Sequence, residues 1–362
     1  MIQEINLNLE KNSYKILVGK SIFNKITDFL QNKNYSKIIV ISDKNVAKIY
    51  RNNFIKILPN IDFIEIESGE SSKSFDNLQK VCEEILQKNI DRKTLLIAFG
   101  GGVVGDLTGF CASILLRGLD FVQIPTTLLA MIDSSVGGKT AINSKFGKNL
   151  IGSFYQPKLV ICDIDFLETL PNREFRAGYA EIVKYGFIFD EKFFDYLDEN
   201  LDKIFAKDQQ ILQKIIARSC EIKSQIVARD EREKGERAIL NFGHTFAHIF
   251  ETETNYSGEL NHGEAVAIGM MMASQLSFEI ALINKEINDK ILNHLQKSGF
   301  ELNVKNIRSN WNLKNLINHL FKDKKTENNQ LTFILLEKIG KAKICKNILI
   351  EDIEKLMKKF LD

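Results

Sequence analysis

Short apolar runs alternate with amphipathic stretches along the first half of the chain. The runs are SKIIVIS (36–42), DFIEIE (62–67), TLLIAF (94–99), LDFVQIP (119–125) and KLVICD (158–163), and DNLQKVCEEILQK (76–88) is typical of the stretches between them. Apolar runs of strand length separated by helical periodicity indicate a parallel α/β sheet. Residues 1–19 alternate apolar and polar positions and also predict strands.

Helical periodicity dominates after LPNRE (170–174). The long helical patterns cover 177–188, 209–230 and 262–283, whereas LTFILLEKIGKAKI (331–344) predicts two short strands. We therefore expect an α/β protein with a parallel-sheet domain over residues 1–171 and a mainly helical domain over residues 172–362.

Composition narrows the classes of function. The chain has 362 residues, of which 44% are hydrophobic and 27% charged, and its net charge is +2. This balance gives no reason to expect a nucleic acid or a membrane surface as partner. Five cysteines with no paired spacing indicate reduced thiols and a cytoplasmic location. No run reaches the roughly 18–20 apolar residues of a membrane span.

A glycine-rich turn follows the apolar run 94–99. In GGGVVGDLTGF (100–110), Gly100, Gly102 and Gly105 satisfy G-x-G-x-x-G. Backbone amides at such a helix start hold a pyrophosphate, so the segment predicts a dinucleotide site. The acidic residue expected at the end of the next strand is absent, and Asp43, after an earlier strand, is better placed for a ribose. The alternative is a tight turn that holds no ligand.

The densest polar segment of the chain covers residues 124–157. It carries the hydroxyls of Thr126 and Thr127, the carboxylate of Asp133, and the cations Lys139 and Lys148. Its GGKT lacks the earlier glycine of a Walker motif, because position 133 is Asp, so a nucleoside triphosphate site is not expected. Lysines beside glycine turns instead favour the phosphate or carboxylate of a small anionic substrate. The alternative is ordinary surface charge.

Histidines are concentrated in two segments of the second half. His244 and His248 lie in NFGHTFAHIFE, and His262 lies in NHGEAVAIGM. With Glu181 of GYAEIVKYG, His244 and His262 supply the three protein ligands typical of a catalytic zinc or cobalt ion. His248, one helical turn from His244, is interpreted as a base or substrate contact. The alternative is that some of these rings are hydrogen-bonded core residues.

Five motifs in this order and spacing resemble the 3-dehydroquinate synthase family. They are GGGVVGD, the run from PTTLLAMIDSSVGGKTAIN to GKNLIGSF, GYAEIVKYG, LNFGHT and NHGEAVAIGM, and the likeness spans at least residues 69–270. The resemblance implies NAD in an N-terminal dinucleotide-binding domain, zinc or cobalt in a C-terminal helical metal-binding domain, and a sugar-acid phosphate substrate in the cleft between them. It also implies a homodimer.

The resemblance assigns roles residue by residue. It places metal ligands at Glu181, His244 and His262. Cofactor contacts fall on Asp43, Glu70, Lys73, Gly102, Val103, Val104, Gly105, Asp106, Thr126, Thr127 and Thr169, with Lys139 and Lys148 adjoining both cofactor and substrate. The residues implied in catalysis are Asp133, Lys139, Lys184, Arg237, Asn241 and His248, the last as a proton shuttle. Further substrate contacts are Arg117, which reaches the neighbouring subunit's site, Lys148, Asn149, Lys223 and either Lys324 or Lys325. Ser72 replaces a common aromatic residue of the cofactor segment.

The implied reaction converts 3-deoxy-D-arabino-heptulosonate 7-phosphate into 3-dehydroquinate and phosphate. It combines transient oxidation, β-elimination of phosphate, re-reduction and intramolecular aldol closure. Two enzyme alternatives stay open at this point, another sugar-phosphate cyclase and a metal-dependent polyol dehydrogenase. A regulatory NAD-binding protein on the same scaffold is not favoured, because such a protein is expected to have lost the metal ligands.

Overall fold

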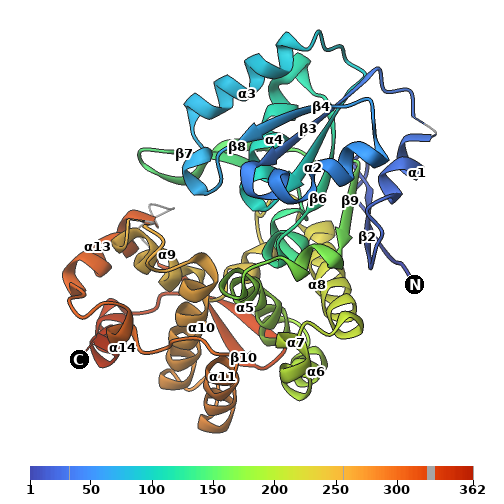
Figure 1. The fold of residues 1–362 in the computed structure, drawn as a ribbon. Helices are drawn as coiled ribbons and strands as arrows, with labels where there is room; N and C mark the ends of the chain where they lie inside the picture. Colours follow the sequence, from blue (N-terminus) through green and yellow to red (C-terminus); the bar gives the residue numbers. More distant parts are fainter. Residues whose placement is uncertain (32, 256, 324–330, 362) are drawn as a thin grey trace. The chain divides into compact units, whose positions relative to one another are not determined.

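A computed structural model describes residues 1–31, 33–255, 257–323 and 331–361 (Figure 1). Contacts divide the chain into two compact units, Met1–Pro171 with Lys207–Arg232, and Asn172–Ala206 with Glu233–Asp362. The expected division after residue 171 coincides with a change of unit, and the segment Lys207–Arg232 joins the N-terminal unit in addition. Its helix α8 (Gln209–Arg229) does so because its buried face packs against strands of that unit.

The N-terminal unit is built around a seven-stranded sheet in the order β1-β2-β9-β6-β5-β3-β4. The sheet strands are β1 (Gln3–Leu7), β2 (Tyr14–Gly19), β3 (Lys37–Asp43), β4 (Asp62–Ile66), β5 (Thr94–Gly100), β6 (Asp120–Pro125) and β9 (Leu159–Asp163). Only β1 runs antiparallel to its neighbour, so the α/β prediction is confirmed for the described residues. Strand β5 is buried along its whole length, which explains its unbroken apolar sequence.

Helices cover both faces of this sheet (Figure 1). They are α1 (Lys25–Gln31), α2 (Lys44–Ile57), α3 (Phe75–Gln87) and α4 (Gly102–Ile114), with short turns η1 (Glu70–Ser72), η2 (Leu115–Arg117), η3 (Ala130–Ser134) and η4 (Ile164–Glu168). Leu96 and Ala98 of β5 pack towards α3 and α4, in one core with Leu78 and Leu107. Phe99 points to the other face, where its ring lies 5.0 Å from Phe54 of α2. This alternation follows from the period of two along a strand.

A separate hairpin lies beside α4. It consists of β7 (Lys139–Ser144) and β8 (Gly147–Phe154), paired antiparallel. The polar segment 124–157, expected to carry cofactor and substrate contacts, therefore also contains a two-stranded sheet. Its strand β8 exposes Leu150 and Phe154, so this face has no covering layer in the described chain.

The C-terminal unit is mainly helical. Its elements are α5 (Asn172–Ile188), α6 (Glu191–Glu199), α7 (Leu201–Phe205), η5 (Glu236–Asn241), α9 (His244–Glu253), α10 (His262–Glu279), α11 (Lys285–Lys297), α12 (Val304–Ile307), α13 (Leu313–Asp323), β10 (Thr332–Lys338), β11 (Lys341–Lys346) and α14 (Ile350–Leu361). Helix α10 is apolar on all sides because α5, α9, α11, α14 and β10 surround it. Strands β10 and β11 form the expected hairpin.

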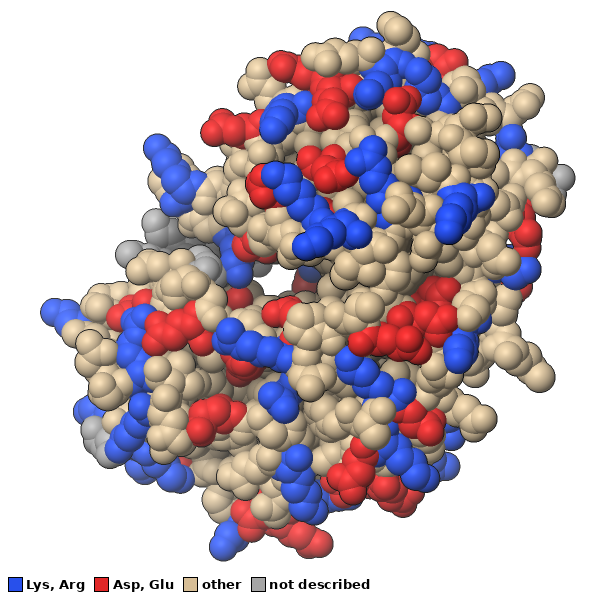
Figure 2. Space-filling view, viewed as in Figure 1, with Lys and Arg blue, Asp and Glu red and all other residues tan. Residues whose placement is uncertain are grey.

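Two surface properties bear on the expectations from composition. Basic and acidic side chains are intermixed on the face drawn in Figure 2. In the part of the chain that the structure describes, no helix combines the length and apolar character needed to cross a membrane.

Candidate metal and cofactor sites

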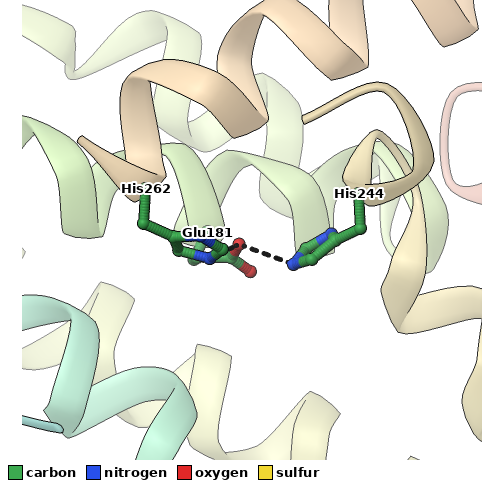
Figure 3. Close-up of side chains that lie close together, drawn as sticks. All are labelled: Glu181, His244 and His262. Atoms are coloured by element: carbon green, nitrogen blue, oxygen red, sulfur yellow. Dashed lines mark ion pairs between the residues drawn. The ribbon is translucent and has the colours of Figure 1, made fainter. Parts of the chain in front are cut away.

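Three helices of the C-terminal unit bring the predicted metal ligands together (Figure 3). Glu181 lies in the middle of α5, while His244 and His262 are the first residues of α9 and α10. The Nε2 atoms of His244 and His262 lie 3.4 and 3.6 Å from Oε1 of Glu181. One ligand atom from each of the three residues lies within 4.8 Å of the other two. A carboxylate and two imidazoles at this spacing suit a divalent zinc or cobalt ion with open positions for substrate oxygens.

The start of α10 is fixed by a capping box. The Asn261 side chain accepts a hydrogen bond of 2.9 Å from the Glu264 amide, and the Glu264 carboxylate accepts one of 2.9 Å from the Asn261 amide. The guanidinium of Arg173 in α5 donates two hydrogen bonds to the same carboxylate, of 2.8 and 2.7 Å. Four hydrogen bonds at this helix start therefore hold the backbone of His262 in place.

Glycines allow the three helices to approach closely. A Cβ added at Gly263 would lie 2.2 Å from the backbone of Ala177 in α5, and one at Gly269 would lie 2.0 Å from the carbonyl oxygen of Gly243. Gly243 itself precedes α9 with φ of +81°, a left-handed conformation that favours glycine. The distances between the three ligands thus depend on backbone contacts without intervening side chains.

The two histidines have opposite electrostatic environments. Burial and the nearby Lys184 ammonium lower the pKa of His244 to about 3. Burial alone would lower the pKa of His262 too, but Glu251 and Glu181 outweigh it and raise this pKa to about 10. Glu181 is fully buried and its Oε2 forms an ion pair with Lys184, one turn along α5. A proton on His262 offsets these buried carboxylates, and a divalent cation would take over that role when it binds.

The other polar residues expected in this unit lie on the same helices or next to them. The ring of His248 is perpendicular to that of His244, with centroids 5.8 Å apart. Asn241, at the end of η5, donates a hydrogen bond of 2.9 Å to Glu233. Arg237 of η5 is buried, with 2% of its surface exposed. Lys324 and Lys325 lie outside the described residues.

The carboxyl ends of three strands meet at the glycine turn of the N-terminal unit. Gly100 of β5 pairs with Pro125 of β6, and Phe99 pairs with Ser42 of β3, so Asp43 and Thr126 flank the turn. Such an edge is where doubly wound sheets bind nucleotides. Oδ1 of Asp43 caps α2 through the amides of residues 45 and 46. Its Oδ2 has no hydrogen-bond partner among the described residues.

The start of α4 has the features of a pyrophosphate cradle. Gly101 caps the helix without a side chain, and a Cβ at Gly102 would already lie 3.0 Å from the Ser134 hydroxyl. The buried hydroxyl of Thr126 finds no partner in the described part of the chain, which leaves it available to a ligand. Gly105 has a packing reason as well, since its Cβ would lie 2.6 Å from Oε1 of Gln123. The residues present therefore fit a dinucleotide.

A second polar cluster gathers predicted residues from distant positions. Nζ of Lys73 lies 2.6 Å from Oδ2 of Asp106 and 3.7 Å from Oε1 of Glu70, and it also donates to Asn149. Burial raises the pKa of Asp106 to about 6, although Lys73 acts in the opposite direction. The cluster links η1, α4 and β8 through one nearly buried ammonium.

Helix α8 brings two of the predicted site residues of the N-terminal unit together. Nζ of Lys223 donates to Oδ1 and to the carbonyl oxygen of Asp133, both at 2.6 Å. Lys139 and Arg117 are exposed, Lys148 is half-buried, and Thr169 shares a hydrogen bond of 2.7 Å with the hydroxyl of Tyr50.

Sequence reasoning missed several partners of these residues. Glu251 faces His262, Glu233 accepts from Asn241, and Asn143 donates to Glu70 at 2.8 Å. Glu251 carried a usable signal, since it follows His244 by seven positions and so lies on the same helical face. Glu233 and Asn143 lie outside regular helices, where spacing gives no such signal.

Comparison with known proteins gives consistent matches over nearly the whole chain. The model described as 3-dehydroquinate synthase N-terminal matches residues 63–177, and that described as 3-dehydroquinate synthase C-terminal matches residues 178–326. A protein named 3-dehydroquinate synthase from Bartonella tribocorum is 46% identical over 360 residues, covering 95% of this chain and 94% of that protein.

Solved structures have the same fold. That of 2-epi-5-epi-valiolone synthase from Streptomyces hygroscopicus subsp. jinggangensis, with NAD+ and Zn2+ bound, has a TM-score of 0.87 at 25% identity and covers 98% of both chains. That of 2-deoxy-scyllo-inosose synthase complexed with carbaglucose-6-phosphate, NAD+ and Co2+ has a TM-score of 0.89 at 23% identity, covering 99% of this chain and 100% of that one. The second likeness bears on the fold only.

Proposed function

The chain belongs to the 3-dehydroquinate synthase family, and we infer from this membership that it converts 3-deoxy-D-arabino-heptulosonate 7-phosphate into 3-dehydroquinate and inorganic phosphate. The observation that carries this inference from the structure is the cluster of Glu181, His244 and His262 on three converging helices. Such a cluster suits a reaction in which adjacent hydroxyls must lose protons while one carbon changes oxidation state.

Both cofactors of the reaction have fitting residues. The amides at the start of α4, Asp43 and Thr126 would hold NAD, and Glu181 with His244 and His262 would hold zinc or cobalt. When bound, NAD would supply reversible oxidation of one substrate carbon, and the metal would supply a charge that lowers the proton affinity of the substrate hydroxyls. The chain's own residues then have to orient an anionic substrate and move protons.

Cations of this chain would bind the two anionic groups of the substrate. Lys139 and Arg117 are proposed to bind the phosphate, together with Lys324 or Lys325. Lys148, Lys223 and Arg237 are proposed to bind the carboxylate and hydroxyls, with Asn149 and Asn241 as neutral partners. The pairing of Lys223 with Asp133 supports this role, because it holds the ammonium in one position before the substrate arrives.

His248 is proposed to shuttle protons at the substrate hydroxyl. Its ring is perpendicular to that of the proposed ligand His244, with centroids 5.8 Å apart, so it lies next to the candidate metal site. In His248→Ala we expect stoichiometric metal and a large fall in turnover. Loss of the metal in that variant would contradict the assignment.

The active species is proposed to be a homodimer in the cytoplasm. Apolar side chains are exposed on and beside the β7–β8 hairpin, namely Phe146, Leu150, Phe154 and Ile114. Exposed apolar side chains gathered on and beside one hairpin favour an interface, and a second copy is the partner that fits a chain whose Arg117 is proposed to serve the neighbouring site. Backbone strain supports that role, since Leu116 and Arg117 both have positive φ. Light scattering of the purified protein and of Leu150→Glu tests the dimer.

Phosphate release from the heptulosonate phosphate, with NADH absorbance followed in parallel, tests the reaction. We expect phosphate without net NADH and loss of activity with a chelator. Net NADH from a polyol would instead assign the chain to the dehydrogenases. Activity with a sugar phosphate that lacks the carboxylate would assign it to the inosose or valiolone cyclases.

A further inference from the structure

The two histidines of the metal cluster differ at the nitrogen that faces away from Glu181. Nδ1 of His244 lies 3.3 Å from the carbonyl oxygen of Phe242, a neutral backbone acceptor. Nδ1 of His262 lies 3.5 Å from Oε1 of Glu251, a carboxylate with only 3% of its surface exposed. The ring of His262 is thus placed between two carboxylates, with Nε2 towards Glu181 and Nδ1 towards Glu251.

We propose that Glu251 is a positioning residue for the metal site, which keeps the proton of His262 on Nδ1 and so directs the Nε2 lone pair to the ion. This inference rests on the proposed ligand set of Glu181, His244 and His262. A carboxylate behind a ligating histidine fixes the tautomer and orientation of the ring and makes it a stronger donor to the metal.

The position of Glu251 makes this role specific. It lies on α9, two turns after His244, whereas its partner His262 begins α10. One helix therefore supplies a metal ligand near its start and the group that orients a second ligand near its end. The close backbone contact of Gly269 with Gly243 holds α9 against α10, so the carboxylate and the imidazole keep their relative position.

The charge of Glu251 adds to the geometric effect. A buried anion next to the imidazole stabilises the positive charge that the ring acquires when it donates to a cation, and low exposure makes this interaction strong. His244, oriented by a carbonyl oxygen, receives no such support. The two imidazoles are therefore unequal ligands, and His262 is the stronger one.

Metal titrations of purified Glu251→Gln and Glu251→Ala test this inference. The amide of Gln keeps an acceptor for the Nδ1 proton but removes the charge, whereas Ala removes both. We expect affinity for Zn2+, measured by competition with a chromophoric chelator, to fall about 10- to 100-fold in Glu251→Ala and less in Glu251→Gln. The visible absorption of the Co2+-loaded protein should change in both, because the field of one ligand has changed.

Glu253 provides a matched control. It lies on the same helix, but its Oε2 lies 2.8 Å from Nε2 of His319, which is not a proposed metal ligand. Glu253→Gln should leave Zn2+ affinity and the Co2+ spectrum unchanged. If Glu251→Ala does not fold, the metal affinity and Co2+ spectrum of Glu251→Gln decide the test, because Gln preserves the volume of the side chain.

His262→Ala separates this inference from the ligand set on which it rests. If His262→Ala loses Zn2+ while both Glu251 variants keep wild-type affinity and spectrum, the role of Glu251 is wrong and the ligand set stands. If His262→Ala binds Zn2+ as the wild type does, both are wrong. Weaker binding and a changed spectrum in the Glu251 variants, with an unchanged Glu253→Gln, support the inference.

Discussion

The candidate sites of the two units consist of different chemical groups. In the N-terminal unit the turn after β5 offers backbone amides, one oxygen of Asp43 and the Thr126 hydroxyl, which has no hydrogen-bond partner among the described residues. In the C-terminal unit the site consists of ionisable side chains, with Glu181 fully buried between Lys184 and two imidazoles. The site of the N-terminal unit therefore depends on the absence of side chains. The site of the C-terminal unit depends on buried charges of opposite sign that compensate one another.

This difference predicts how each site fails. A backbone site keeps its folding stability when a nearby charge changes, whereas an added Cβ blocks the approach of the ligand. A site of buried charges loses binding and stability together when one charge is removed, because the remaining partner stays buried without compensation. Variants in the two units should separate ligand affinity from folding stability to different degrees.

The largest effect is expected for Glu181→Gln. It should lose zinc, reduce phosphate release by about a thousandfold or more, and lower the free energy of unfolding by about 3 kcal/mol because Lys184 loses its charged partner. Metal analysis and urea unfolding measure both effects. The matched control Glu174→Gln, exposed on the same helix, should change neither. Stoichiometric zinc in Glu181→Gln would contradict the assignment.

Two glycine variants should separate stability from affinity. Gly269→Ala places a Cβ 2.0 Å from a backbone oxygen, so we expect a loss of about 3 kcal/mol in unfolding free energy and weaker metal binding. Gly102→Ala meets only the Ser134 hydroxyl, at 3.0 Å, and should change stability by less than about 1 kcal/mol. Its NAD affinity should fall about tenfold or more, because the Cβ lies where the pyrophosphate approaches. Chemical unfolding and calorimetric NAD titration would show these effects. Equal stability of the two variants would contradict the comparison.

The raised pKa of Asp106, in the helix α4 that follows the glycine turn, makes the free energy of unfolding depend on pH. Burial raises the pKa of Asp106 from 3.8 to about 6, so between these values the folded chain holds a proton that the unfolded chain has released. Stability from this residue is therefore present below pH 4 and is lost as pH rises to 6, by at most about 3 kcal/mol. Asp106→Asn should remove this slope when unfolding is measured across that range. An unchanged slope would place the titrating group elsewhere.

The smallest effect is expected at Asp43. Asn at this position keeps Oδ1 as an acceptor for the amides that start α2, so stability should change by less than about 0.5 kcal/mol. NAD affinity should fall several-fold, because a charged acceptor for a ribose hydroxyl is lost. Asp208→Asn, which alters the cap of α8 by the same chemistry, is the control and should leave NAD affinity unchanged. Equal NAD affinity in both variants would remove Asp43 from the cofactor site.

The sequence predicted the parts of this structure that depend on local pattern. Continuous apolar runs predicted β3, β5 and β6, and because parallel strands end at a common edge, Asp43 and the glycine turn were expected near each other. The cluster of Glu181, His244 and His262 was predictable because histidine and glutamate have few other reasons to gather beside glycines. Apolar periodicity shows that 209–230 is a helix with one buried face but not which sheet it covers, so the contact of Lys223 with Asp133 was not foreseen. The β7–β8 hairpin was missed because Leu150 and Phe154 are exposed, which removes the usual alternation.

The two histidines at the starts of α9 and α10 place two helix starts beside the candidate metal site. Each helix start carries about half a positive charge, which disfavours the bound ion but attracts anions to its open positions. Small oxyanions from solution are therefore expected to bind at the candidate metal site in competition with the substrate. Rates measured in phosphate or sulfate buffers should fall below those in zwitterionic buffers, and released phosphate should slow the enzyme as it accumulates.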